Sequence, residues 1–215
     1  KNEFADQSAI VIGGSRGLGE VTVKLLAAGS ANVKFSYFKG ERDAKKILND
    51  IHNYNGSKAS IFQYDVLTPN ERMLKKILQD YNPTHLYYFA TPFIFSATKG
   101  NFSKKIYSQF YDYYVNGFKN IMEMVLTFGI KNVYYPSSIA LDECPPDMQE
   151  YVSAKTDGEA LCEKFMENNK MINIYKPRLP RLETDQTVSL SNVFNHDPFK
   201  IQLKHLRNLK AKNEI

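Results

Sequence analysis

A tyrosine and a lysine four positions apart, Tyr151 and Lys155, are the residues of this sequence best suited to proton transfer. They lie in a segment of helical period over residues 148–168, so both side chains share one face of a helix. A neighbouring ammonium favours the phenolate, which would lower the pKa of Tyr151 from about 10 towards neutrality and let it donate and accept a proton. Ser138 stands thirteen residues before Tyr151, at the end of a predicted strand. We therefore expect Ser138, Tyr151 and Lys155 to form one catalytic site.

The same Tyr-x-x-x-Lys spacing also occurs at Tyr54 and Lys58. Gly56 interrupts that second pair at the end of a predicted helix, and no serine at a strand end accompanies it. The surroundings therefore favour Tyr151 and Lys155 as the reactive pair.

A glycine-rich turn occupies residues 13–19, with the sequence GGSRGLG, between the first predicted strand and the first predicted helix. In a parallel α/β sheet this is the place where a dinucleotide pyrophosphate meets the N-terminus of a helix. Glycine is needed there because a Cβ would block the turn or keep the phosphate away from the backbone N–H groups. The turn therefore predicts a dinucleotide-binding site.

The choice of dinucleotide is expected to be made near the end of the second strand, where an acidic residue would bind a ribose 2′-hydroxyl. Lys39 stands twenty residues after Gly19, and Arg16 lies within the glycine turn. Two cations favour a 2′-phosphate, so we predict NADP(H) as the cofactor. Glu41 keeps NAD(H) as the weaker alternative.

Short apolar runs alternate with longer segments of helical period along the chain, which is typical of βαβ units. Strands are predicted at residues 8–14, 32–38, 59–65, 85–90, 132–137 and 172–176, and helices at 18–28, 41–54, 70–81, 103–128 and 148–168. This order predicts an α/β fold with a Rossmann-like, doubly wound parallel sheet in three αβα layers. We expect a single NAD(P)-binding domain over residues 1–215, in which residues 178–215 form an irregular or helical tail on the substrate side.

Composition excludes several classes of function. Residues 200–215 carry five Lys or Arg side chains and one Glu, so almost all of the formal net charge of +5 lies there, and we interpret it as a solvated terminal helix rather than a nucleic-acid site. No apolar run approaches the 18 or so residues of a membrane span, which favours a cytoplasmic protein. Cys144, Cys162 and the four histidines show no metal-binding spacing, so we expect no metal site.

Taken together, the Gly-x-x-x-Gly-x-Gly turn, Ser138, Tyr151-x-x-x-Lys155 and a helical asparagine, Asn116, resemble the short-chain dehydrogenase/reductase family over residues 9–177. The resemblance implies that Tyr151 is the general acid towards a carbonyl substrate and that Ser138 binds the substrate oxygen. It also implies that Lys155 lowers the pKa of Tyr151 and holds the nicotinamide ribose, while Asn116 completes a proton relay.

The resemblance extends to cofactor contacts beyond the glycine turn. Asp65 and Val66 are similar to the family's adenine-contacting pair, Ala90 follows the fourth strand, and Pro177 is similar to the nicotinamide-side proline. The expected cofactor contacts are Gly13, Ser15, Arg16, Gly17, Leu18, Gly19, Tyr37, Lys39, Asp65, Val66, Ala90, Thr91 and Pro177. The aromatic residues at 110–114 fit a homodimer or homotetramer, because the helix that carries Asn116 often lies in the family's dimer interface.

These features predict an NADPH-dependent oxidoreductase of ketoreductase or carbonyl reductase type, acting on a small-molecule ketone. The basic tail and the missing initiator methionine are also compatible with a domain of a larger multienzyme whose substrate is tethered to a carrier protein. The 22-residue interval from Asn116 to Ser138 keeps a nucleotide-sugar epimerase or dehydratase as an alternative. Only 38 residues follow Pro177, and residues 89–92 (FATP) depart from the family's Asn-Asn-Ala-Gly, so a non-catalytic NADP-binding module is a further alternative.

Overall fold

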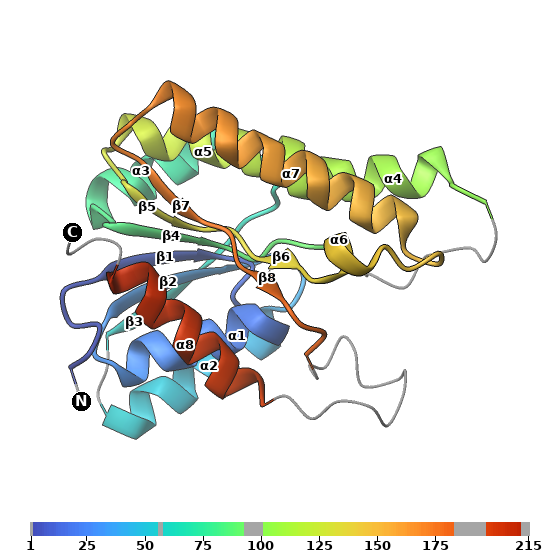
Figure 1. Ribbon diagram of the computed structural model, residues 1–215. Coiled ribbons are helices and arrows are strands. Elements are labelled where there is room, and N and C mark those ends of the chain that lie inside the picture. The colour runs from blue at the N-terminus through green and yellow to red at the C-terminus, as the bar shows by residue number, and fades with distance from the viewer. Residues whose placement is uncertain (1, 56–57, 93–100, 183–196, 212–215) are drawn as a thin grey trace.

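The computed structural model describes residues 2–55, 58–92, 101–182 and 197–211. A parallel sheet of six strands runs through the middle of the molecule in the order β3-β2-β1-β4-β5-β7 (Figure 1). Its strands are β1 (Ser8–Ile12), β2 (Asn32–Tyr37), β3 (Ala59–Gln63), β4 (His85–Tyr88), β5 (Asn132–Tyr134) and β7 (Asn173–Tyr175). The predicted α/β fold with a Rossmann-like, doubly wound parallel sheet is confirmed.

Helices cover both faces of this sheet and complete the three layers (Figure 1). One face carries α1 (Gly17–Ala28), α2 (Glu41–Asn55) and α8 (Pro198–Ala211). The other face carries α3 (Glu71–Tyr81), α4 (Lys104–Tyr111), the π-helical segment η1 (Asp112–Gly117), α5 (Phe118–Thr127) and α7 (Gln149–Asn168). A short helix α6 (Ala140–Glu143) and a two-stranded parallel sheet of β6 (Ser137–Ser138) and β8 (Arg178–Leu179) complete the described elements. None of the helices in these ranges is long and apolar enough to cross a membrane.

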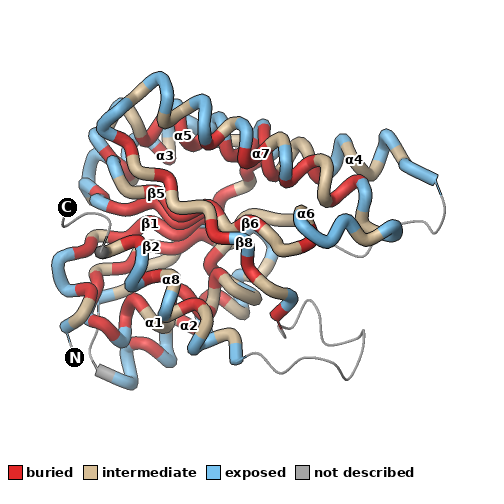
Figure 2. Tube along the Cα trace, viewed as in Figure 1, coloured by how far each residue is buried: buried red, intermediate tan, exposed pale blue. Residues whose placement is uncertain are grey.

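The central strands β1, β4 and β5 are buried on both faces, which is why they read as nearly continuous apolar runs, whereas the edge strand β3 is only partly buried (Figure 2). Alternate residues of β1 point to opposite sides. Ile10 and Ile12 belong to the apolar cluster formed with α3, α5 and α7. Ala9 and Val11 belong to the cluster formed with α1, α2 and α8. This packing fixes the carboxyl ends of the strands, where the candidate site lies.

Each predicted strand ends one to three residues earlier than expected, and two of these early ends bear on the site. The strand predicted at 85–90 ends at Tyr88, and the strand predicted at 132–137 ends at Tyr134. Residues 89–92 and 136–138 leave the sheet and line a cavity at its carboxyl edge. The shortening therefore frees the residues that build the candidate site.

The helix predicted at 103–128 is continuous, but its central residues, 112–117, are π-helical. A π turn loosens the backbone hydrogen bonding, and such turns are frequent at functional sites. Two strand-borne hydroxyls bind carbonyls of this segment. Tyr88 Oη donates to the carbonyl of Tyr113 at 2.6 Å, and Tyr135 Oη donates to the carbonyl of Tyr114 at 3.1 Å. The sheet therefore holds the π segment in place.

The basic helical segment near the C-terminus is not a solvated tail. Helix α8 packs on α1, and the side chains of Gln202, Leu206 and Leu209 are fully buried. Gln202 Nε2 donates to Thr22 Oγ1 at 2.9 Å, and Arg207 forms an ion pair with Glu3 at 2.5 Å. The prediction of a solvated terminal helix was therefore wrong, because the apolar face of α8 covers one side of the sheet.

Candidate active site

A cavity of about 630 Å³ opens at the carboxyl edge of the sheet, where ligands bind in folds of this kind. The glycine turn after β1 lines one part of the cavity, and residues of β6 and α7 line another part. The residues predicted from the sequence that line the cavity are Gly13, Ser15, Arg16, Leu18, Gly19, Lys39, Val66, Ala90, Thr91, Ser138, Tyr151 and Lys155. One continuous space therefore joins the predicted cofactor turn to the predicted catalytic residues.

Two glycines of the turn, Gly13 and Gly19, have no room for a side chain. Gly13 has a φ of +80°, and a Cβ there would stand 2.8 Å from the backbone nitrogen of Ala90. A Cβ on Gly19 would stand 2.1 Å from the carbonyl oxygen of Gly13. Helix α1 begins at Gly17, within this turn, and the Arg16 side chain does not cap it. The leading N–H groups of α1 therefore have no side-chain cap, so the turn fits a dinucleotide pyrophosphate.

Two cations lie where β2 ends. Lys39 is exposed and lines the cavity, and Arg16 lines it beside Ser15 and Gly40. The guanidinium of Arg16 is held by Asp43, with Nε and Nη2 at 2.9 and 2.8 Å from Oδ2. These positive groups suit a phosphate at the adenosine end of the cavity.

Tyr151 enters the cavity from the first turn of α7 and is only 9% exposed. The rings of Phe110 and Tyr114 stand edge-on to it, with centroids 5.6 and 5.8 Å away. Burial raises the pKa of Tyr151 above its ordinary value of 10.0, and a hydrogen bond with Ser138 offsets part of that rise. The phenol is therefore neutral at neutral pH, and the expected lowering of its pKa is not observed.

The surroundings of Lys155 explain this difference. Its Nζ donates to the carbonyl of Pro136 at 2.7 Å and lies 3.9 Å from the ring centroid of Tyr114. Burial lowers the pKa of Lys155 to about 7. The amine is therefore only partly charged near neutral pH, so it stabilises a phenolate less than the sequence spacing suggested.

Asn116 does not reach the site. Its side chain is exposed, and its Nδ2 donates to Asp112 Oδ1 at 2.8 Å, one turn earlier. Tyr114, two positions before it, lines the cavity instead. Residues two apart in a helix lie on nearly opposite sides, so only one of the two can face the cavity. Tyr114 is thus a site residue that the sequence reasoning had grouped with the aromatic residues of a subunit interface.

Four predicted cofactor residues lie outside the cavity lining. Tyr37 packs against the apolar cluster of α1 and α2. Asp65 accepts hydrogen bonds from the backbone of Leu67 and from Thr68, and the carbonyl of Pro177 accepts one from the backbone of Ser137. Gly17 lines a neighbouring hollow at the start of α1. Tyr37, Asp65 and Pro177 therefore make structural contacts, and Gly17 lies beside the cavity.

A charged cluster supports the base of the site. Glu159 is nearly buried on α7, one turn after Lys155, and accepts a hydrogen bond of 2.5 Å from Ser137 Oγ. Both of its oxygens also accept hydrogen bonds from Arg178, at 3.0 and 2.8 Å. Arg178 further binds Asp142. The cluster therefore ties α7 to β6 and β8 next to Ser138.

The cavity has a further part lined by residues that follow β6 and β8, namely Glu143, Asp147, Met148, Pro180, Arg181 and Leu182. The last three belong to the segment that was expected on the substrate side, whereas the first three were not predicted from the sequence. Residues 183–196, which follow Leu182, and residues 93–100, which follow Pro92, are outside the described residues. Within the described ranges, no group of three or more His, Cys, Asp or Glu side chains could hold a metal ion.

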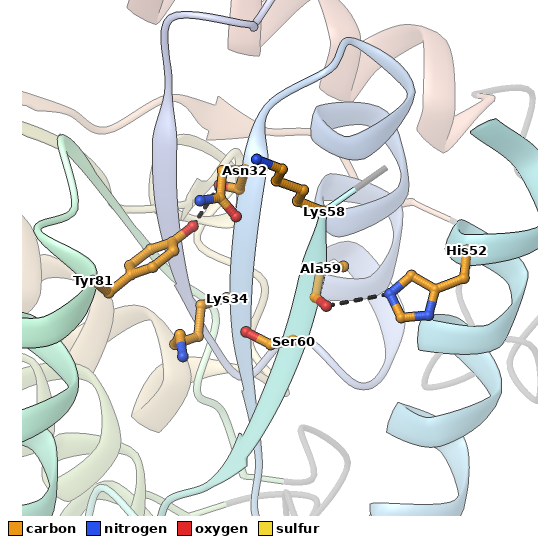
Figure 3. Close-up of a pocket in the computed structure, with 7 residues that line it drawn as sticks. All are labelled: Asn32, Lys34, His52, Lys58, Ala59, Ser60 and Tyr81. Atoms are coloured by element: carbon orange, nitrogen blue, oxygen red, sulfur yellow. Dashed lines mark hydrogen bonds between the residues drawn. The ribbon is translucent and has the colours of Figure 1, made fainter. Parts of the chain in front are cut away.

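A second hollow, of about 580 Å³, lies at the opposite, amino edge of β2 and β3 (Figure 3). Tyr81 Oη donates to the carbonyl of Asn32 at 2.6 Å, and His52 Nε2 lies 3.3 Å from the carbonyl of Ala59. The side chains of Lys34 and Lys58 extend in different directions and do not converge (Figure 3). The chemistry-bearing residues therefore gather at the carboxyl edge and not here.

No protein-family model matches the chain. The L-rhamnose 1-dehydrogenase (NADP(+)) of Thermoplasma acidophilum is 30% identical over 86 residues, which are 39% of this chain and 34% of that protein. The match thus spans about a third of that relative's length.

Solved structures match over much more of the chain. A short chain dehydrogenase from Shigella flexneri complexed with NADP has a TM-score of 0.84 at 15% identity, covering 97% of this chain and 93% of that one. An alcohol dehydrogenase from the archaeon Thermococcus sibiricus complexed with 5-hydroxy-NADP has a TM-score of 0.78 at 18% identity, covering 94% and 89%. At these identities the likeness shows the fold. The chain has the short-chain dehydrogenase fold, as the resemblance predicted.

Proposed function

We propose that this protein is an NADP(H)-dependent oxidoreductase that reduces a ketone carbonyl to an alcohol. The observation that carries the proposal is the single cavity that joins the glycine turn at Gly13 to Ser138, Tyr151 and Lys155. When bound, the nicotinamide supplies a hydride to the carbonyl carbon.

The chain's own residues supply the proton. Burial keeps Tyr151 a neutral phenol, the form that can donate its proton to the carbonyl oxygen as the hydride is added. The Ser138 hydroxyl, which is hydrogen-bonded to that phenol, would orient the carbonyl oxygen beside it. The ketone thereby gains a hydride at carbon and a proton at oxygen, and Tyr151 is left to regain its proton from solvent.

The choice of NADP(H) is supported by the two cations at the end of β2. Arg16 and Lys39 line the cavity there, and Asp43 fixes the guanidinium of Arg16. The two solved structures described above were complexed with NADP or its 5-hydroxy derivative, and the named relative is an NADP(+) dehydrogenase.

Titration with NADPH and NADH, followed by nucleotide fluorescence, tests the cofactor part of the proposal. NADPH should bind at least tenfold more tightly than NADH, and equal affinities would contradict the assignment. A panel of ketones added to the saturated protein then tests turnover by loss of NADPH absorbance.

The matched variants are Tyr151→Phe and Tyr54→Phe. Loss of a general acid costs about 10²–10⁴ in rate, so Tyr151→Phe should lose that much turnover and keep its affinity for NADPH. Tyr54 shares the four-residue spacing to a lysine but is 73% exposed, so Tyr54→Phe should behave as the wild type. An active Tyr151→Phe variant would overturn the mechanism, and binding without turnover of any ketone would favour a non-catalytic module.

A further inference from the structure

Tyr114 lies against both side chains that are proposed to handle the proton. It projects from the π segment η1 into the cavity and is itself 1% exposed. Its ring meets the ring of Tyr151 edge-on, at an interplanar angle of 86°, while its face lies 3.9 Å from the amine of Lys155. One buried ring therefore contacts both members of the Tyr-x-x-x-Lys pair.

The amine of Lys155 has few polar neighbours. Its hydrogen bond goes to the carbonyl of Pro136, and the ion pairs of the described residues leave it without a carboxylate partner. The ring of Tyr135 lies farther from it than that of Tyr114, at 5.0 Å. A cation over an aromatic face is attracted by the ring quadrupole, more strongly where water is excluded. The face of Tyr114 is thus the nearest support for the ammonium apart from one carbonyl.

The titratable and charged groups around Lys155 come from three places. Its own helix contributes Tyr151, Glu159 and Cys162, η1 contributes Tyr114, and the end of β5 contributes Tyr135. Of these groups, only Glu159 is charged at neutral pH, and its oxygens are already bound by Arg178 and Ser137. None of these acidic groups therefore stabilises the Lys155 ammonium in place of the Tyr114 ring.

The hydroxyl of Tyr114 is committed elsewhere. It lies 2.6 Å from Thr91 Oγ1, and Thr91 Oγ1 donates its own proton to the carbonyl of Pro92 at 3.1 Å. A hydroxyl carries one proton, so Tyr114 must donate and Thr91 must accept in the first of these bonds. Tyr114 therefore has no proton to give to a substrate, and its ring is the functional part.

We propose that Tyr114 is a positioning residue whose ring face holds the Lys155 amine against the Pro136 carbonyl, beside the phenol of Tyr151. The inference rests on the proposed function, since it assigns a role within that site, but it can be measured without turnover. Burial lowers the pKa of Lys155 to about 7, and the ring opposes this effect by stabilising the ammonium. Removing the ring should therefore lower the pKa of Lys155 further.

Three variants of the full chain separate the ring from the hydroxyl. Tyr114→Phe keeps the aromatic face and loses the bond to Thr91, whereas Tyr114→Leu loses both, with Tyr114→Met as the substitute if the Leu variant does not fold. Tyr111→Leu is the control, because Tyr111 precedes Tyr114 on the same continuous helix and its ring contacts Tyr107 instead, at a tilted angle.

The first measurement is an NMR titration of the cofactor-free protein labelled with ¹³C in its lysine side chains, with the Lys155 signal assigned by its loss in Lys155→Met. The titration midpoint of Lys155 should fall by about one pH unit in Tyr114→Leu, the size expected for a desolvated cation–π contact. It should stay within about 0.3 units in Tyr114→Phe and Tyr111→Leu. An unchanged midpoint in the Leu variant would overturn the proposal.

The second measurement is the pH dependence of kcat for ketone reduction by the saturated enzyme. Tyr114→Leu should lose about tenfold or more in kcat, and the limb of its profile that reports Lys155 should move to lower pH, while Tyr114→Phe keeps most of the activity. If Tyr114→Phe loses as much as Tyr114→Leu, the hydroxyl and not the ring is responsible, and the proposal fails. A wild type that reduces no ketone would defeat the proposed function alone, because the NMR titration still decides whether Tyr114 holds Lys155.

Discussion

The hydroxyl of Tyr135 donates to the main-chain carbonyl of Tyr114, and Gly158 of α7 approaches that hydroxyl as closely as only a glycine can. A Cβ built on Gly158 would stand 2.0 Å from the Tyr135 oxygen. The end of β5, the π segment and the helix that carries Tyr151 and Lys155 therefore meet at one hydroxyl. The position of α7, which carries the proposed proton-transfer pair, depends on this contact.

Gly158→Ala is expected to destabilise the protein by about 2 kcal/mol, because the added methyl group must displace a buried tyrosine. Helix propensity alone predicts the opposite sign, since alanine is favoured over glycine by about 1 kcal/mol in a helix interior. Urea unfolding measures the difference. Adding Tyr135→Phe, which removes the clashing oxygen, should recover at least half of the loss, and a more stable Gly158→Ala variant would contradict the contact.

Acidification is expected to weaken the cluster around Glu159. Burial acts to raise the pKa of this carboxyl, but the hydrogen bonds from Arg178 and Ser137 outweigh it, so the pKa is lowered from 4.5. The stabilisation is therefore fully present above pH 4.5 and is lost as the pH falls through the lower pKa of the folded state.

Glu159→Gln should accordingly cost about 2 kcal/mol at pH 7, the usual worth of hydrogen bonds to a charged group, and less at pH 3. Glu163→Gln is the matched control, since Glu163 lies one turn further on α7 in an exposed ion pair with Lys176. Its loss should cost less than about 0.5 kcal/mol at either pH. Equal losses of stability in the two variants would mean that the buried cluster stabilises the protein no more than an exposed ion pair does.

Lys155 is expected to make stability rise with pH. Its pKa is about 7 in the folded protein against 10.5 when exposed, so between these values the unfolded chain binds a proton that the folded state does not. The free energy of unfolding should gain up to about 1.4 kcal/mol per pH unit from this residue between pH 7 and about 9.5. Chemical unfolding of Lys155→Met should lack that gain, and the exposed Lys119→Met should retain it.

Arg16 is expected to distinguish the two dinucleotides. Arg16→Ala removes a charged hydrogen-bond donor from the adenosine end of the cavity, so the Kd for NADPH should rise about tenfold or more and the Kd for NADH by less than about twofold. Isothermal titration measures both. Arg42→Ala provides the control, because Arg42 is exposed near the start of α2 and does not line the cavity. Equal losses of affinity for NADPH and NADH would mean that Arg16 does not contact a 2′-phosphate.

The order of strands and helices could be predicted from the sequence because the central strands of this sheet are buried on both faces. Runs such as residues 8–12 are therefore apolar enough to stand out, and the glycine turn after that run has a fixed place in the fold. Helix α8 could not be placed in the same way, because its charged residues dominate its composition and only its contacts with α1 show which face is buried.

Asn116 was predicted to lie in the site, but Tyr114 lies there instead, and this error has a similar physical cause. Spacing along the chain does not say which side of a helix faces a cavity, and a π turn changes that side further. The sequence offered only a glycine at position 117 as a signal. The structure shows that Gly117 packs against the hydroxyl of Tyr88, and because residues three apart on a helix share a face, Tyr114 also points inward. The pKa values could not be predicted at all, because they depend on burial and not on spacing.

The contact of α8 with the start of the chain also bears on how the molecule is made. Gln202 binds Thr22 from 180 positions away, and Arg207 binds Glu3 from 204. Contacts between such distant residues close slowly and only after most other structure is in place. A chain emerging from the ribosome therefore leaves the apolar surface of α1 uncovered by α8 until residues 198–211 have been synthesised, and apolar surface exposed in this way is prone to aggregation.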